Sequence, residues 1–125
     1  MEIEVSIGEV VDKYTILCIK RLLIDDKGRV QNVEKEWEYL KFILQHKHPD
    51  IFDDSLTVEL HKVNKQLWDV EDDIRSCERA GIFEGQFISL ARSVYKLNDH
   101  RANLKKQINI KYNSEFIEEK SYKEY

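Results

Sequence analysis

The sequence predicts an all-α fold, an up-down bundle of about four helices dominated by one long antiparallel helical hairpin. First, the 125 residues include one proline and four glycines, so few residues interrupt a helix. Second, apolar residues recur every three or four positions, the period of a helix buried along one face. Third, the two longest periodic stretches, 55–80 and 85–112, are joined by only about four residues, so they must fold back on each other.

The N-terminal segment 1–5 alternates apolar and acidic side chains, which indicates an extended lead-in or a short strand. Ser6 and Glu9 follow with the spacing of a capping box, in which each side chain accepts a hydrogen bond from the other residue's backbone N–H. A first helix is expected over about residues 7–24, and the polar stretch 25–28 is expected to end it. Its predicted apolar face consists of Ile7, Val10, Val11, Tyr14, Leu17, Cys18 and Leu22.

A second helix is expected over about residues 30–46, where Val33, Trp37 and Leu40 repeat with helical spacing. The following segment, 46–54, contains the only proline and three aspartates, and it is expected to be a loop. The first two helices are expected to cover one side of the long hairpin.

The hairpin consists of a third helix over about residues 55–80 and a fourth over about residues 85–112. Each carries a heptad seam, and the two seams face each other in an antiparallel pair. The seam of the third helix comprises Leu56, Leu60, Val63, Leu67, Val70, Ile74 and Cys77. The seam of the fourth comprises Phe87, Leu90, Val94, Leu97, Arg101, Leu104 and Ile108. Gly81 stands where a left-handed residue would end the third helix, and Ile82 follows it.

The remaining segment, 113–125, carries Phe116, Ile117, Tyr122 and Tyr125 among glutamates and lysines. Disordered tails are usually poor in such residues, so this tail is expected to dock on the bundle or on a second copy. No linker rich in Pro, Gly or Ser divides the chain, so residues 1–125 are expected to form a single helical domain.

Composition argues against several classes of protein. The net charge is −4 and the two signs are interspersed, so no concentrated basic face is available for a nucleic acid. No stretch approaches the ~18 apolar residues of a membrane span, and no secretory signal is visible. We therefore expect a cytoplasmic protein with no membrane or nucleic-acid partner. Cys18 and Cys77 both fall on helical apolar stripes, which favours buried thiols over a disulfide.

One charged residue, Arg101, occupies a seam position of the fourth helix. Either its side chain reaches past the seam to solvent, or acceptors inside the bundle pair with it. The expected fold places Arg101 opposite Asn64 and next to Asn98, with Asp12 and Glu71 as the candidate carboxylates. The polar stripe that begins at Asn64 continues through Trp68, Glu71, Arg75 and Glu78.

The acidic residues within 69–73 suggest a magnesium site as an alternative. Helical nucleotide pyrophosphohydrolases bind magnesium through carboxylates one turn apart, and Glu34 and Glu38 could face this patch from the second helix. The patch lies away from the seam, however, and the glutamate-pair spacing typical of those enzymes is absent. The histidines within 46–48 lie in a loop without a third ligand at a fixed helical step. No metal and no cofactor are therefore expected.

Several stretches of the sequence carry a resemblance to known proteins: 6–17, 67–75, 91–95, 98–99, 101–102 and 118–122. They resemble a family of small bacterial and phage-borne helical proteins grouped as a domain of unknown function. The resemblance covers nearly the whole chain, is loosest in the second helix and the loop after it, and implies no activity. By this resemblance, the family's recurring polar residues correspond here to Glu9, Asp12, Lys13, Glu71, Arg75, Arg92, Asn98, Asp99 and Arg101.

Periodicity and resemblance together define one candidate polar cluster. It comprises Glu9, Asp12, Asn64, Trp68, Glu71, Arg75, Arg92, Asn98 and Arg101. The main hypothesis is a non-enzymatic helical interaction or oligomerisation module, in which this cluster is a closed structural network. The alternative is a small anionic-ligand binder or enzyme, with the cluster forming a pocket between the first, third and fourth helices. Converging unpaired charges would favour that alternative.

A homodimer is expected because the first helix is apolar on more than one side. Ile16, Ile19 and Leu23 lie apart from the stripe that contains Val11 and Tyr14. One core of this size is too small to cover both stripes, so the first helix or the tail is expected to form the contact between copies.

Overall fold

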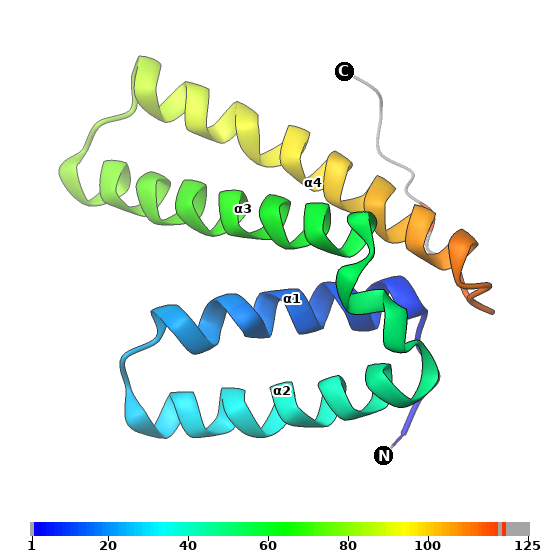
Figure 1. Ribbon diagram of the computed structural model, residues 1–125. Helices are drawn as coiled ribbons and strands as arrows, with labels where there is room; N and C mark the ends of the chain where they lie inside the picture. Colours follow the sequence, from blue (N-terminus) through cyan, green and yellow to red (C-terminus); the bar gives the residue numbers. More distant parts are fainter. Residues whose placement is uncertain (1, 118, 120–125) are drawn as a thin grey trace.

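The computed structural model describes residues 2–117 and 119, and within them the chain forms four α-helices and one short 3₁₀-helix (Figure 1). The elements are α1 (Ile7–Leu23), α2 (Lys27–Lys47), η1 (Pro49–Asp53), α3 (Ser55–Ala80) and α4 (Gly85–Lys111). Residues 2–5 belong to no helix and no strand. The predicted all-α fold with a long hairpin of α3 and α4 is confirmed. None of the helices described is long and apolar enough to cross a membrane.

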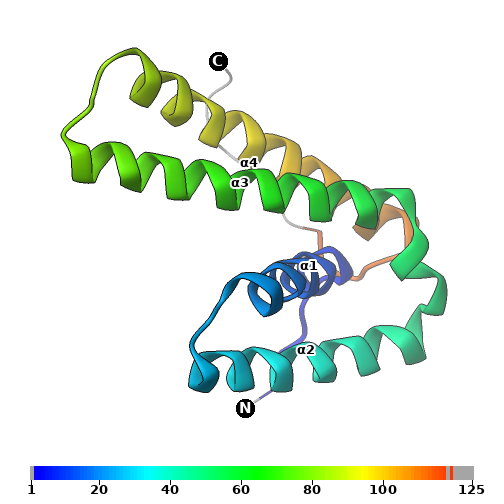
Figure 2. The same cartoon turned by 60° about the vertical axis from the view of Figure 1, so that its left-hand side comes forward.

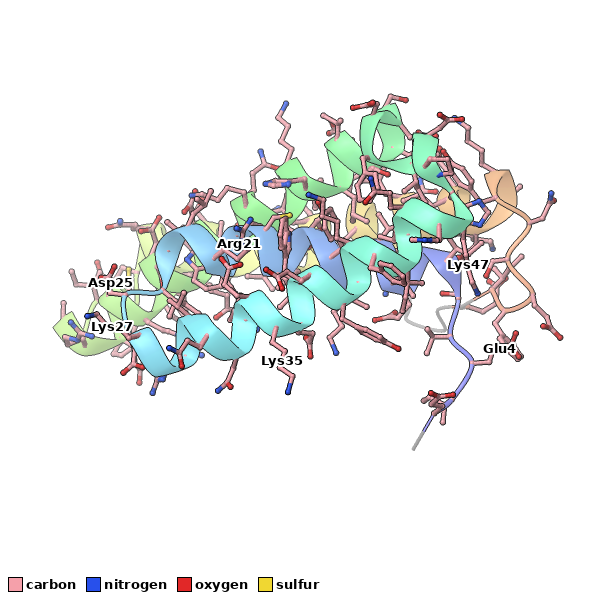
Figure 3. All side chains as sticks on the ribbon, turned by 60° about the horizontal axis from the view of Figure 1, so that its bottom comes forward. Glu4, Arg21, Asp25, Lys27, Lys35 and Lys47 are labelled. Carbon is pink, nitrogen blue, oxygen red and sulfur yellow. The ribbon has the colours of Figure 1, made fainter. Side chains whose placement is uncertain are left out.

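Helix α1 lies at the centre of the arrangement, because it packs against α2 on one side and against both α3 and α4 on the other. Figures 1 and 2 show α2 on the far side of α1 from the hairpin. The expectation that α2 would help cover the hairpin was therefore wrong. The exposed side chains of Lys27, Lys35 and Lys47 project from α2 toward solvent (Figure 3), as expected of an outermost helix.

Side-chain caps explain where α1 and α2 begin. The Ser6 hydroxyl accepts a hydrogen bond from the Glu9 N–H at 3.1 Å, so α1 begins as predicted. Asp26 was expected to end a helix, but its carboxylate accepts from the Arg29 N–H at 3.0 Å and starts α2. Gly28 consequently lies inside the first turn of α2 rather than in a break.

The closed end of the hairpin has the predicted helix terminus. Gly81 has φ of 71°, and the Ile82 N–H donates to the Cys77 carbonyl at 2.9 Å, the long-range bond of a Schellman motif. The expected loop 46–54 differs from the prediction, since residues Pro49–Asp53 form a 3₁₀-helix. That helix drives Ile51 fully into the core.

The hydrophobic core lies where α1, the end of α2, η1 and the open end of the hairpin meet. Its fully buried members are Val11, Leu44, Ile51, Leu60, Val63, Leu104 and Ile108. Leu67 and Leu97 pack against this cluster, but the seam residues beyond them do not. We call the outer part of the hairpin, residues 69–98, the arm. Figures 1 and 2 show its closed end extending away from α1 and α2.

The tail folds back on the bundle as far as it is described. The Ile7 N–H donates to the Ser114 hydroxyl at 3.1 Å, and Lys106 pairs with Glu119 at 3.0 Å. Phe116 and Ile117, which were expected to dock, are exposed. Tyr122 and Tyr125, which were expected to dock, lie outside the described residues.

Candidate functional site

Asp12 is the most deeply buried acidic residue near the predicted cluster, with 1% of its surface exposed. Arg101 reaches it from α4 and donates from Nε to Oδ1 at 2.9 Å and from a terminal nitrogen to Oδ2 at 2.5 Å. Asn64 of α3 donates to Oδ1 at 2.9 Å. The predicted pairing of Arg101 with Asp12 is confirmed. A buried carboxylate is costly unless it is paired in this way.

Thr15 completes this group, although it was not among the predicted residues. Its hydroxyl donates to the Asp12 carbonyl at 2.8 Å and accepts from the Asn64 amide at 2.9 Å. The Asn64 amide nitrogen therefore serves both Asp12 and Thr15. The sequence offered one sign of this role, because Thr15 lies one turn after Asp12 on the same face of α1. We call Asp12, Thr15, Asn64 and Arg101 the Asp12 network.

Two further polar contacts extend the α1–α4 interface beyond the Asp12 network. The Gly8 N–H donates to the Asn109 side-chain oxygen at 2.6 Å, and Glu9 pairs with Lys105 at 2.7 Å. A Cβ at Gly8 would collide with the Lys105 carbonyl oxygen, so only glycine allows the two helices to approach this closely. Asn109 was also missed from the sequence, because its side chain bonds to a backbone group that no pattern reveals.

The remaining predicted residues are not part of this network. Glu71 and Arg75 are exposed on the arm, 3.8 Å apart in a pair one turn apart along α3. Trp68 and Asn98 are half-buried, and Arg92 is exposed. The single cluster predicted from the sequence was therefore wrong in extent. The predicted residues on α3 share one helix face with Asn64. That face continues along the arm, where α1 no longer covers it, so these residues cannot reach Asp12.

A separate buried carboxylate, Asp54, joins η1 and α3 to the end of α4. It accepts hydrogen bonds from the Leu56 N–H at 2.8 Å, the Tyr112 hydroxyl at 2.5 Å and the Lys111 amine at 2.6 Å. Burial acts to raise the pKa of Asp54, but the hydrogen bonds from Lys111, Tyr112 and Leu56 outweigh it and lower the pKa. Burial and the bond to Asp54 raise the pKa of Tyr112 to about 12.

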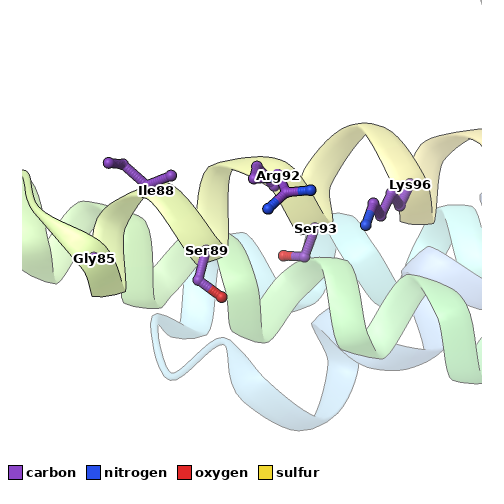
Figure 4. A pocket seen from close by; sticks show the side chains of 6 residues that line it. All are labelled: Gly85, Ile88, Ser89, Arg92, Ser93 and Lys96. Carbon is purple, nitrogen blue, oxygen red and sulfur yellow. The ribbon is translucent and has the colours of Figure 1, made fainter. Parts of the chain in front are cut away.

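Three cavities lie on the described part of the chain, and only the third touches the Asp12 network, through Thr15. One of about 330 Å³ is lined by six residues of α4 alone, and Figure 4 shows Ser89, Arg92, Ser93 and Lys96 following one another along it. A second, of about 820 Å³, lies between the N-terminal lead-in, α1 and α2. A third, of about 420 Å³, lies between α1, η1 and α3. None of the three is lined by Asp12.

The magnesium arrangement considered from the sequence was wrong in its geometry. Helix α2 packs on α1 and η1, so Glu34 and Glu38 cannot face the acidic residues of α3. Glu34 instead pairs with Arg21 at 2.7 Å, and the Arg21 guanidinium lies 3.6 Å from the centre of the Trp37 ring (Arg21 is labelled in Figure 3). Within residues 2–117 and 119, no three His, Cys, Asp or Glu side chains converge as metal ligands do.

The fold and the Asp12 network define a small all-α protein whose first and last helices are joined by buried polar pairs. The chain belongs to a family of unknown function (DUF6165), whose model matches residues 1–125. The predicted membership of a family of unknown function is thus confirmed over the whole chain, and this membership supplies no activity. None of the curated proteins and none of the solved structures compared with the chain matches it.

Proposed function

We propose that this chain is a non-enzymatic helical module that forms a homodimer through its arm. The observation that carries the proposal is a change in burial along one continuous seam. Leu60 and Leu104 are buried where α1 covers the hairpin, whereas Ile74 and Leu90 are only half-buried on the arm. Cys77 is the exception among the seam residues of the arm, because it is buried. A seam of this kind is expected to be covered in the functional state.

The Asp12 network supports a structural role over a catalytic one. Both carboxylate oxygens of Asp12 are occupied, and the Asn64 amide and the Thr15 hydroxyl are used within the network. A binding site needs groups that remain available to a ligand, and these groups are already satisfied. The network therefore fixes how α1 sits on the hairpin, which in turn sets the direction of the arm.

Exposed apolar residues at the closed end of the arm give the proposed contact its hydrophobic component. Ile82, Phe83 and Ile88 are each about half-exposed, and the rings of Phe83 and Phe87 meet edge to face with centres 5.4 Å apart. Ile19 of α1, by contrast, is buried within one chain. Leu22, which was expected on the apolar face of α1, and Leu23 are exposed at the end of that helix. We place the contact between copies on the arm because more of the exposed apolar side chains gather at its closed end.

Charge complementarity favours a second copy of this chain as the occupant. The α3 part of the arm, residues 69–80, has five acidic and two basic residues, whereas the α4 part, residues 85–98, has two basic and none acidic. In the described part of the chain, Glu78 and Arg92 form no ion pair. Each arm thus carries both halves of a complementary surface, which a two-fold dimer would bring together.

Light scattering and sedimentation from low to high micromolar concentration test this proposal. Wild-type protein is expected to be a dimer, and Ile88→Glu is expected to be a monomer because it places a charge in the contact. Ile110→Glu is the matched control, since Ile88 and Ile110 lie on the same helix and are 53% and 59% exposed. A wild-type monomer at high micromolar concentration would refute the proposal.

A charge exchange tests the identity of the occupant. One variant carries Arg92→Glu and Lys96→Glu, and another carries Asp72→Lys, Asp73→Lys and Glu78→Lys. Each variant alone is expected to be monomeric, because like charges then meet across the contact. An equimolar mixture is expected to form a one-to-one heterodimer. If the mixture stays monomeric, the charge argument for a second copy is wrong.

The alternative, a binder of a small anionic ligand, is supported by the α4 cavity. Arg92 and Lys96 line it together with the hydroxyls of Ser89 and Ser93, and among the described residues neither cation forms an ion pair. Titration with inorganic phosphate, followed by amide chemical shifts, tests this reading. Saturable shifts at Ser89 and Ser93 that disappear in Arg92→Gln would favour it.

The cytoplasm is the proposed location of the module. Cys18 is half-buried, Cys77 is buried, and neither forms a disulfide. Free thiols of this kind suit a reducing compartment.

A further inference from the structure

We propose that the cavity between α1, η1 and α3 binds a small aromatic carboxylate of about one ring. This inference is independent of the proposed self-association, because the cavity lies away from the arm. Its volume of about 420 Å³ falls within the size range of small-molecule sites. The lining residues that carry the inference are Tyr14, Cys18, Phe52, Thr57, His61 and Lys62.

Thr57 provides the observation that points to a ligand. It is only 5% exposed, and its hydroxyl is the one buried side-chain polar atom in the described part of the chain that has no hydrogen-bond partner. Thr15 lines the same cavity, but its hydroxyl is already engaged by the Asp12 network. A buried hydroxyl without a partner is unfavourable, so an occupant that bonds to Thr57 would be stabilised.

The walls of the cavity suit an aromatic ring. Tyr14 and Phe52 meet edge to face, with ring centres 5.3 Å apart, and Tyr14 is also stacked on Trp37, with ring centres 6.1 Å apart. These rings are held in place by their neighbours, so they form a preorganised apolar surface. Cys18 adds a polarisable sulfur whose lone pair accepts from the Trp37 N–H at 3.2 Å.

The rim of the cavity selects for negative charge. Lys62 is exposed and His61 is half-exposed, and within the described residues neither forms an ion pair. A carboxylate on the ring could be attracted by Lys62 and could accept a hydrogen bond from Thr57. A neutral aromatic compound would contact only the apolar walls of the cavity. A small aliphatic acid would interact only with the charged rim.

Titration with benzoate, followed by amide and methyl chemical shifts of the full chain, tests this proposal. Benzoate is expected to shift signals around Cys18, Thr57 and Phe52 saturably, whereas benzyl alcohol and acetate each bind about tenfold more weakly. Thr57→Val and Lys62→Gln are expected to weaken benzoate about tenfold, and Thr57→Ser is expected to retain it. The control is Lys13→Gln, an exposed lysine on α1 outside the cavity.

Two further measurements test the same cavity. Because the Thr57 hydroxyl has no hydrogen-bond partner in the described part of the chain, Thr57→Val should raise the melting temperature while weakening benzoate binding. Benzoate should also slow alkylation of Cys18, and Cys77 is too buried to interfere. Absence of saturable shifts, equal binding by Thr57→Val, or a lower melting temperature of Thr57→Val because water alone fills the cavity would each overturn the proposal.

Discussion

Asp12 and Arg101 are separated by 89 positions in the sequence, yet they form a two-point hydrogen-bonded pair between α1 and α4. The pair is asymmetric, because the Asp12 side chain is 2% exposed and that of Arg101 is 30% exposed. The carboxylate therefore depends on the guanidinium more than the guanidinium depends on it. That asymmetry determines what each substitution should do.

Replacing Arg101 with Ala should destabilise the fold by about 3 kcal/mol, because it leaves the buried Asp12 carboxylate without its main partner. Combining Arg101→Met with Asp12→Leu should recover much of the loss, because the buried charge is then absent. Urea denaturation of the single and double variants measures both values. Arg75→Ala is the control, since the Arg75 side chain is 78% exposed, and it should change stability by less than about 0.5 kcal/mol.

Replacing Gly8 with Ala should be destabilising by about 2 kcal/mol, because the added methyl group meets the Lys105 carbonyl and the Asn109 side chain. Gly85→Ala is the matched control, since nothing lies within 4 Å of a Cβ there. It should leave stability unchanged or raise it by a few tenths of a kcal/mol. Thermal unfolding of the two variants checks this, and a neutral Gly8→Ala would contradict the tight contact.

Acid should weaken the fold through Asp54. Its pKa is lowered from the ordinary value of 3.8, so the folded state favours the ionised carboxylate. This contribution to stability is present above pH 3.8 and is lost as the pH falls below that value toward the lowered pKa. The stability of Asp54→Asn should depend less steeply on pH in this range, as measured by urea unfolding. Asp53→Asn, an exposed neighbour, should behave as the wild type does.

Alkali should weaken the fold through Tyr112. Because its pKa is raised from 10.0 to about 12, its contribution is present below pH 10 and is lost as the pH rises toward 12. Tyr112→Phe should cost about 1 kcal/mol at neutral pH and should reduce the loss of stability in alkali. Tyr39→Phe, at an exposed position, should do neither. An ordinary phenolate titration of Tyr112 in the folded protein would contradict this prediction.

The positions of the helices along the chain could be predicted from the sequence more reliably than the contacts between the helices. Helical periodicity placed three of the four helices to within a residue at each end, because an apolar stripe is a local property of the chain. The start of α2 was misplaced because Asp26, two residues before Gly28, could end the first helix or cap the next. Local pattern does not distinguish these roles, which depend on where the chain turns in space.

Only part of the candidate site could be predicted, because local pattern does not show which helices meet in space. Arg101 was identifiable because a charge on an apolar seam requires a partner, and the same logic led to Asp12 and Asn64. Glu71 and Arg75 were included wrongly in the network because periodicity continues along α3 without indicating where α1 ceases to cover it. Thr15 and Asn109 were missed because their partners are backbone groups or amides, which have no signature in sequence.

The pairing of Asp12 with Arg101 also has a consequence for synthesis on the ribosome. Helix α1 emerges early, but its buried carboxylate has no guanidinium to meet until most of α4 has been translated. Until then, closing α1 over α3 would bury a charge without its main partner. Helices α1 and α3 should therefore remain unpacked from each other through most of elongation. Final closure should come as α4 leaves the exit tunnel, and a transcript truncated before Arg101 should yield a protease-sensitive product.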